Sequence, residues 1–300
     1  MLSHAMRRKN LKPELNRVLE KMKNEDNSHA INEELLNAEC RIIWRDEPFA
    51  HINNFTDSLK TLSTYSAWIS YGGLRTGSTF VTMAMRILLS SMVDIFLTGW
   101  EGDYKEPQKF FELAQETPGI EAGILKIHRY EKFCNKLLKQ DRAKAVVSTR
   151  DYQSIAGSYT RMKANRHSPF FQKQKVSDQQ LLDFIGKQIE DHKKKREIPN
   201  TLFIRESEIR QNPGGAVSRI AGHMGLHLTA TSTRYIGEKL NIESQKKTQQ
   251  KTIINSTGHG ESNFMHHEHI NTTEEGYENK FSELIFAHFG KELGEDGYLK

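Results

Sequence analysis

The residues best suited to chemistry lie at positions 72–79, a loop that combines three glycines, three hydroxyl side chains and one arginine. A short apolar run at 68–71 precedes the loop, and apolar residues at helical spacing follow it from Phe80 onward. A strand, a small-residue loop and a helix in this order direct backbone N–H groups and the positive end of a helix dipole toward one point. Glycine lets the backbone of such a loop approach an anion closely. The pattern therefore predicts a phosphate-binding loop.

This loop departs from the Walker A sequence GxxxxGK[ST] at one important position. Gly72, Gly77 and Thr79 fit that pattern, but Ser78 replaces the lysine that reaches the β- and γ-phosphates of a nucleoside triphosphate. Arg75 instead places one positive charge inside the loop. A triphosphate-binding loop is therefore poorly supported, and a glycine-rich turn without a ligand is the alternative interpretation.

Polar side chains also follow two later predicted strands. Lys126 and His128 end one apolar run, and Arg150 directly follows the β-branched run Ala143–Thr149. In a parallel sheet, ligands bind at the carboxyl ends of the strands. Arg75, Lys126 with His128, and Arg150 are therefore predicted to meet at one edge of a sheet.

The elements that must position these residues alternate between strands and helices, which is typical of βαβ units. The predicted fold class is α/β: a central parallel sheet flanked by helices on both faces, in a P-loop-like arrangement of three layers. We expect strands at 68–71, 124–127, 143–149 and 201–205, and helices from 80 onward and at 133–140, 154–162, 181–195, 215–226 and 281–289. The apolar segment 83–100 is interpreted as a buried helix, and residues 100–120 as a polar connection.

The two ends of this alternating region differ from it in composition. Residues 1–60 are polar and contain two short amphipathic patterns, so we predict a helical N-terminal extension at 1–60 and an α/β domain at 61–300. Beyond residue 240 the chain is rich in Lys, Gln, Thr, Asn and His.

Charge and cysteine content restrict the classes of function and location. Forty-three basic against 38 acidic residues give a net charge of +5, which favours anionic ligands but lacks the clustering expected for nucleic-acid binding. The one basic run, residues 193–196, ends a predicted helix and is interpreted as its solvated C-terminus. Cys40 and Cys134 form no disulfide framework. Arg86 and Asp94 interrupt the longest apolar segment, and no signal peptide is visible, so we expect a cytoplasmic protein without a membrane span.

In their order along the chain, the three motifs resemble the sulfotransferases that use 3′-phosphoadenosine 5′-phosphosulfate (PAPS). The matching segments are RTGSTF from Arg75, KIH from Lys126, and RDYQSIAGS, in which Ser158 follows Arg150 by eight positions. The strand that ends at Glu206, the Asn-Pro pair before the helix at 215–226, and that helix are also typical of the family. The resemblance covers residues 67–226, about half of the chain.

The resemblance implies a role for each matched residue. PAPS is the implied donor and adenosine 3′,5′-bisphosphate the product, and no metal is required. The implied cofactor-binding residues are Arg75, Thr76, Gly77, Ser78, Thr79 and Phe80 for the 5′-phosphosulfate, and Arg150 and Ser158 for the 3′-phosphate. His128 is the implied general base, and Lys126 and Arg75 are implied to stabilise charge on the sulfonyl group and the leaving phosphate.

Two features depart from the family pattern. Ser154 stands where many relatives have aspartate between the arginine and the serine. The Arg-Lys-Gly stretch that covers the 3′-phosphate in cytosolic members is absent, and the corresponding region is HGESNFMHHEHINTTEEGY. We expect His267 or His269 to take part of the role of the missing stretch. A metal site formed by His266, His267 and His269 is an alternative, but a solvated loop is favoured over it.

The acceptor is expected to be a small molecule that carries a hydroxyl or an amine. Its pocket would come from residues 100–122 and 160–180 and from the N-terminal helices. An apolar wall of this pocket and core packing are both consistent with the aromatic residues Phe110, Phe111, Tyr130, Phe170 and Phe171. A P-loop-type kinase or other ATP-dependent phosphotransferase is the alternative, with Asp151 as its candidate Mg²⁺ ligand, and a non-catalytic scaffold is a third. Whether the chain forms a homodimer stays open.

Overall fold

The structure is a computed structural model of residues 1–300 and describes residues 67–90, 96–100, 106–116, 122–164, 176–241 and 275–297. The predicted N-terminal extension at 1–60 lies outside the described residues, as do Cys40 and the histidines His266, His267 and His269.

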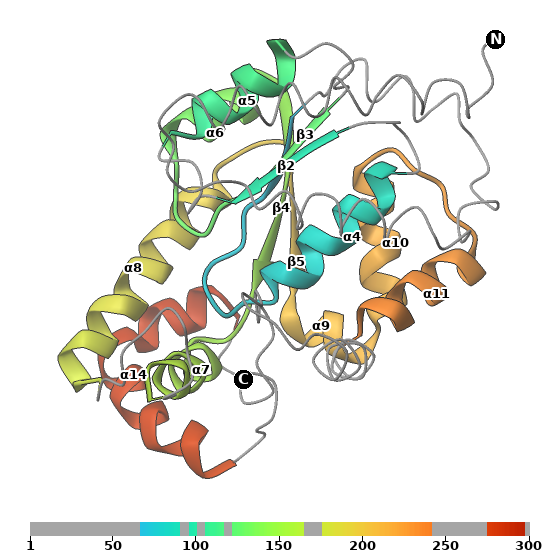
Figure 1. Ribbon diagram of the computed structural model, residues 1–300. Coiled ribbons are helices and arrows are strands. Elements are labelled where there is room, and N and C mark those ends of the chain that lie inside the picture. The colour runs from blue at the N-terminus through green and yellow to red at the C-terminus, as the bar shows by residue number, and fades with distance from the viewer. Residues whose placement is uncertain are drawn as a thin grey trace, which may run out of the picture.

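Five parallel strands form one sheet in the order β2-β3-β1-β4-β5 (Figure 1). The strands are β1 Ala67–Ser70, β2 Phe96–Trp100, β3 Ala122–Lys126, β4 Ala143–Thr149 and β5 Thr201–Arg205. Strand β1 lies at the centre, where its last residue, Ser70, pairs with Lys126 of β3 and Val146 of β4. The loops after these three strands therefore leave the same edge of the sheet.

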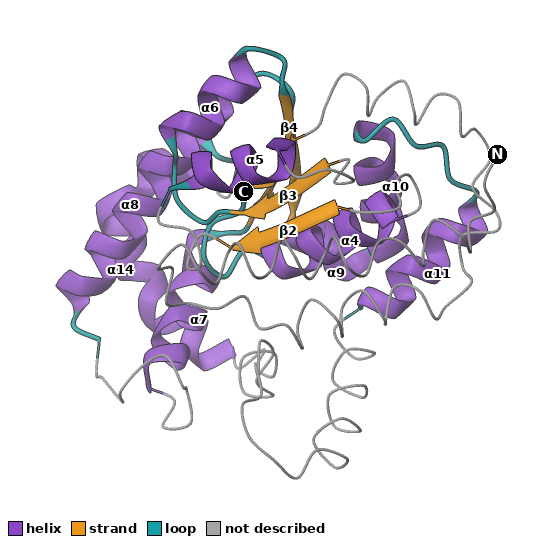
Figure 2. Ribbon diagram, turned by 45° about the horizontal axis from the view of Figure 1, so that its top comes forward, coloured by secondary structure: helices purple, strands orange, loops and turns teal. Residues whose placement is uncertain are grey.

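Helices cover both faces of the sheet, which confirms the predicted α/β fold class (Figures 1 and 2). One face packs on α4 Ser78–Ser90, α9 Glu206–Gln211, α10 Pro213–His223 and α11 Ala230–Leu240, and the other on α5 Pro107–Glu116 and α6 Lys132–Lys139. Successive side chains of a strand point to opposite faces. Accordingly, Trp68 belongs to the first core and Ile69 to the second, and both are fully buried.

A third apolar cluster joins α7 Tyr152–Ala164, α8 Asp178–Arg196 and α14 Glu275–Glu295, beside the carboxyl edge of β4. Tyr152 and Ile155 of α7 pack there against Ile185 of α8 and Ile285 of α14. The cluster fixes α7, the helix that carries Ser158.

The interpretation of residues 83–100 as one buried helix is wrong. Helix α4 ends at Ser90, and residues 96–100 form β2, which pairs with β3 at the edge of the sheet. A short, continuous apolar run fits a buried strand and a buried helix equally well, so periodicity could not separate the two.

The interpretation of residues 100–120 as a polar connection is also wrong, because α5 occupies Pro107–Glu116. Proline is favoured at the first helical position, so Pro107 begins this helix and does not interrupt it. Phe110 and Phe111 of α5 are 0% and 3% exposed in the core, which excludes them as an open acceptor wall.

The other predicted elements are confirmed, with small differences in their ends. Strands β4 and β5 have the predicted bounds, and the predicted helices correspond to α4, α6, α7, α8, α10 and α14. Helices α9 and α11 were not predicted. Within the described ranges, no helix has both the length and the apolar character needed to cross a membrane.

The interpretation of residues 193–196 as a solvated helix end is wrong for one residue. Lys195 is 2% exposed, although Lys193 and Lys194 beside it are exposed. The side chain of Lys195 turns inward because its ammonium donates a hydrogen bond to the carbonyl of His128 (3.1 Å) and lies 4.2 Å from the centroid of the Tyr71 ring.

The buried carboxylate of Asp296 links the end of α14 to α7 and α8. Asp296 accepts a 2.5 Å hydrogen bond from the hydroxyl of Tyr152 on α7 and forms a 2.6 Å ion pair with Arg196 of α8. Its side chain is 1% exposed, so solvent does not replace either partner. Hydrogen bonds to charged groups contribute more to stability than those between neutral groups.

We therefore expect Asp296→Ala to lower the free energy of unfolding by about 2 kcal/mol, measured by urea denaturation. The matched control is Glu190→Ala, which removes the exposed i,i+4 pair with Lys194 and should change stability far less than Asp296→Ala does. Equal effects of the two substitutions would contradict the assignment of Asp296 as an anchor.

Candidate functional site

The loop after β1 is folded by its own side chains and held against β4. The Thr76 hydroxyl donates to the carbonyl of Gly73 (2.7 Å) and lies 2.8 Å from the hydroxyl of Ser148 in β4. A Cβ atom on Gly72 would lie 2.0 Å from Ser148 Oγ and 2.9 Å from Ser78 Cβ. Only glycine fits at position 72, so the course of the loop is determined by close packing.

Two residues of this loop have left-handed backbone conformations, Arg75 with φ 68° and Gly77 with φ 88°. Glycine adopts this conformation readily, whereas arginine does so at some cost, and such strain is concentrated at functional sites. The turn leads directly into α4 at Ser78. The first N–H groups of a helix have no partner within it, so the start of α4 presents free amide donors at the carboxyl edge of the sheet.

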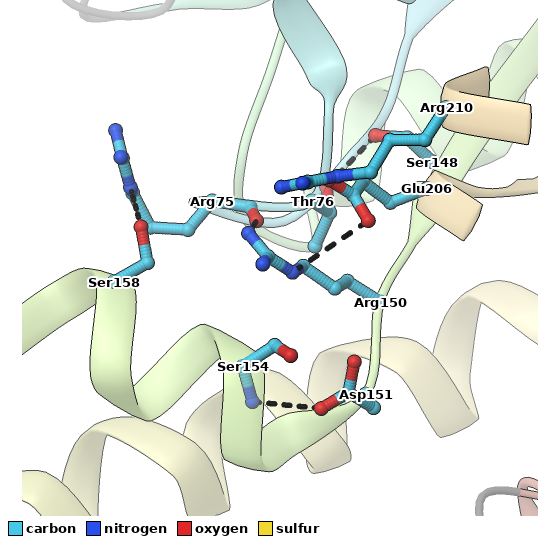
Figure 3. A network of polar contacts seen from close by, with 9 residues as sticks. All are labelled: Arg75, Thr76, Ser148, Arg150, Asp151, Ser154, Ser158, Glu206 and Arg210. Atoms are coloured by element: carbon cyan, nitrogen blue, oxygen red, sulfur yellow. Dashed lines mark hydrogen bonds and ion pairs between the residues drawn. The ribbon is translucent and has the colours of Figure 1, made fainter. Parts of the chain in front are cut away.

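Three arginines gather beside this helix N-terminus. Arg75 Nε donates a 2.7 Å hydrogen bond to Ser158 Oγ on α7, and Arg150 Nη1 donates to the carbonyl of Arg75 (3.5 Å; Figure 3). Burial, followed by the charges of Arg150 and Arg161, lowers the pKa of Arg75 to about 10. Arg75 therefore keeps its charge at neutral pH, in surroundings that are already positive.

One carboxylate lies among these cations. Glu206, the first residue of α9, lies 3.8 Å from Arg150 Nε and also pairs with Arg210 (Figure 3). The side chains of Glu206 and Arg150 are each 13% exposed. Glu206 thus orients Arg150 from the start of α9, directly after β5, the strand next to β4.

The Lys126–His128 pair approaches the same loop from β3. Lys126 Nζ donates to the hydroxyl of Thr79 in the first turn of α4 (3.1 Å), and His128 Nδ1 lies 3.0 Å from the carbonyl of Gly72. A carbonyl can only accept, so Nδ1 carries the proton and Nε2 of a neutral imidazole keeps its lone pair. Burial and then the charge of Lys126 lower the pKa of His128 to about 3, so the ring is neutral at physiological pH.

The structure brings together every predicted site residue from the three motifs. Ser158 contacts Arg75, so the first and third motifs are in direct contact. Phe80 packs its ring into the core, and its main chain lies in the first turn of α4. Whether these residues bind the parts of PAPS that the resemblance implies stays a prediction.

Sequence reasoning missed Arg161 and Lys195 and gave no role to Arg210. Arg161 follows Ser158 by three positions on α7, a spacing that places two side chains on one helix face, so this signal was present. Arg210 lies one turn after Glu206 on α9, but α9 itself was not predicted. No signal in the sequence distinguishes Lys195 from its basic neighbours.

The candidate Mg²⁺ ligand of the kinase hypothesis has a structural role. Asp151 Oδ1 accepts a 2.7 Å hydrogen bond from the backbone N–H of Ser154 at the start of α7 (Figure 3). This contact caps the helix that carries Ser158. Ser154, which departs from the family pattern, contributes its main chain to the same cap.

Neither models of protein families nor curated protein sequences match this chain. Solved structures do resemble it. Mouse sulfotransferase SULT7A1 complexed with PAP has a TM-score of 0.50 and 13% identity, over 78% of this chain and 90% of that one. A retinol dehydratase with androsterone and inactive cofactor PAP has a TM-score of 0.49 and 17% identity, over 80% of this chain and 84% of that one.

A second retinol dehydratase structure, in a complex with retinol and PAP, has a TM-score of 0.48 and 16% identity, over 80% of this chain and 85% of that one. The likeness to the mouse enzyme extends over most of both chains. Together with the parallel sheet and the loop that leads into α4, this likeness identifies the fold. The chain has the fold of the PAPS-dependent sulfotransferases.

Proposed function

We propose that this protein is a sulfotransferase that moves the sulfonyl group of PAPS to a hydroxyl or an amine of a small-molecule acceptor. The observation that carries the proposal is the meeting of the Arg75–Ser158–Arg150 group with the Lys126–His128 pair at the start of α4. The first group has the chemistry to bind anions, and the second has the chemistry to move a proton.

The donor groups fit a doubly phosphorylated nucleotide. The amides of Gly77, Ser78 and Thr79 form one anion site at the helix N-terminus, together with Thr76 and the amide of Phe80. Arg150, directly after β4, and Ser158, on α7, form a second anion site. Burial, followed by the charges of Arg150 and Arg161, lowers the pKa of Arg75, so an incoming anion stabilises its charged form. When bound, PAPS supplies an activated sulfonyl group, and the proposal requires no metal.

His128 is positioned to act as the general base. Its Nε2 atom takes the acceptor proton, while the carbonyl of Gly72 holds Nδ1–H and so maintains the tautomer. General bases contribute about 10²–10⁴-fold to rate. Lys126 and Arg75 stabilise negative charge that grows on the transferred group and on the leaving phosphate. The negative charge of a bound anion would raise the pKa of His128, which makes Nε2 a stronger base.

The kinase alternative has less support. Ser78 stands in place of the Walker lysine, and the Asp151 carboxylate caps α7. The scaffold alternative leaves unexplained why a histidine held in one tautomer lies next to a lysine at the phosphate loop.

Binding of adenosine 3′,5′-bisphosphate tests the cofactor. We expect the wild-type protein to bind it in EDTA, measured by calorimetry, and Arg150→Ala to weaken binding by about 10–100-fold, since a hydrogen bond to a charged group contributes about 1.5–3 kcal/mol. Arg219→Ala is the matched control, because Arg219 pairs with Glu208 on the surface. Binding of ATP with Mg²⁺ in place of the bisphosphate would favour the kinase alternative.

Removal of the base tests the mechanism. We expect His128→Ala to lower turnover by about 10²–10⁴-fold while the affinity for adenosine 3′,5′-bisphosphate changes little. Near-normal turnover in this variant, with PAPS and a panel of hydroxyl and amine acceptors, would exclude His128 as the base.

The pH dependence of stability tests the neutral state of two buried histidines, His128 and His223. Because burial lowers the pKa of His128 to about 3 and that of His223 to about 4, the unfolded chain binds protons below pH 6.5 that the folded chain does not. Stability should therefore fall as pH falls from about 6.5 toward 4. His223→Gln should make this decrease less steep in urea denaturation, and an unchanged slope would contradict the burial of a neutral imidazole.

A further inference from the structure

Lys195 differs from the other basic residues of its helix end. It is 2% exposed, whereas its neighbours in the run 193–196 form ion pairs with carboxylates of α8 or of the end of α14. A buried ammonium is costly unless it is well bonded. The contacts that compensate for the burial of Lys195 therefore indicate where this side chain acts.

Two partners of the ammonium adjoin the candidate site. Lys195 Nζ donates to the main-chain carbonyl of His128 (3.1 Å) and lies over the ring of Tyr71, 4.2 Å from its centroid. A cation over the face of an aromatic ring is attracted by the negative charge of that face, most strongly where water is excluded. One side chain of α8 thus holds the segment after β3 and the segment after β1.

These two segments carry the two halves of the proposed chemistry. Tyr71 immediately precedes Gly72, whose carbonyl orients the imidazole of His128. The Tyr71 hydroxyl accepts from the N–H of Glu131 (2.5 Å) and donates to Asn135 Oδ1 (3.2 Å), so the ring beneath Lys195 is fixed at its far end as well.

Lys195 also borders the phosphate side of the site. Together with Gly73, Ser148 and Arg150 it lines a cavity of ≈ 20 Å³ between the loop after β1 and α8. A polar cavity of this size holds about one water molecule. The ammonium therefore lies behind the loop, within the same arrangement of side chains as the base and the second anion site.

On this basis we propose that Lys195 is a positioning residue, which holds the backbone of His128 at a fixed distance from the anion-binding loop. The inference rests on the proposed function, because it assigns His128 the role of base. Lys195 touches no reacting atom and acts through the His128 carbonyl and the Tyr71 ring.

The test replaces Lys195 in the full-length protein. Lys195→Met keeps the length of the side chain and removes its charge and donor, and Lys194→Met is the matched control on the adjacent, exposed position. Lys195→Gln, which keeps a donor, serves as the second variant if the Met variant does not fold. Urea denaturation of each variant establishes that it is folded.

We expect Lys195→Met to lower kcat by about 10–100-fold, since a displacement of about 1 Å costs up to about 10²-fold in rate. The affinity for adenosine 3′,5′-bisphosphate should stay within about threefold of wild type, because the direct anion-binding groups are retained. Lys194→Met should leave both quantities unchanged. A parallel loss of affinity and kcat, or an equal effect of Lys194→Met, would overturn the proposal.

A second readout needs no turnover. The charges that lower the pKa of His128 are Lys126 on β3, Lys195 on α8 and Arg75 in the loop after β1, and the carbonyl of Gly72 acts in the opposite direction. We expect the NMR titration of the His128 ring to move to higher pH in Lys195→Met. An unmoved titration with the same Nδ1–H tautomer would overturn the positioning role. If the wild-type protein transfers no sulfonyl group, the proposed function fails, and this titration still decides whether Lys195 positions His128.

Discussion

The concentration of positive charge at one edge of the sheet is the constraint on which the rest of the site depends. Arg75 is surrounded by so much protein and so many cations that its pKa falls to about 10, and the nearby imidazole of His128 is kept neutral by the same causes. Glu206 offsets part of this charge at Arg150. Burying such a cluster of charges costs free energy, which the packing of the rest of the fold must offset. The apolar cluster of α7, α8 and α14 contributes to this packing.

The fold was largely predictable because strands and helices alternate with clear periodicity, and β4 and β5 lie at their predicted bounds. The errors have physical causes. The apolar residues of helix α4 and of the edge strand β2 belong to one long apolar segment of the sequence. Pro107 begins a helix, where its missing N–H is harmless. Helix α9 has six residues, too few for a periodic pattern to be visible.

The site was predictable to the extent that it follows from the carboxyl ends of parallel strands. Arg75, Lys126 and Arg150 could be assigned to one edge because each lies at the carboxyl end of a strand or in the segment that follows one. Contacts between side chains of different elements could not be read in the same way. The hydrogen bond from Arg75 to Ser158 and the inward turn of Lys195 depend on the packing of α7 and α8, which leaves no mark on the local pattern.

The all-parallel sheet has a consequence for how this protein acquires its binding site. The contacts that define the site join residues far apart in the chain: 83 positions separate Arg75 from Ser158, 67 separate His128 from Lys195, and 56 separate Gly72 from His128. Long-range pairings close large loops and form slowly. No short stretch of the chain can therefore carry the site alone. A nascent chain gains the binding site only when β1 has paired with β4 and α7 and α8 have packed beside them. Occupancy of the site therefore reports a finished fold.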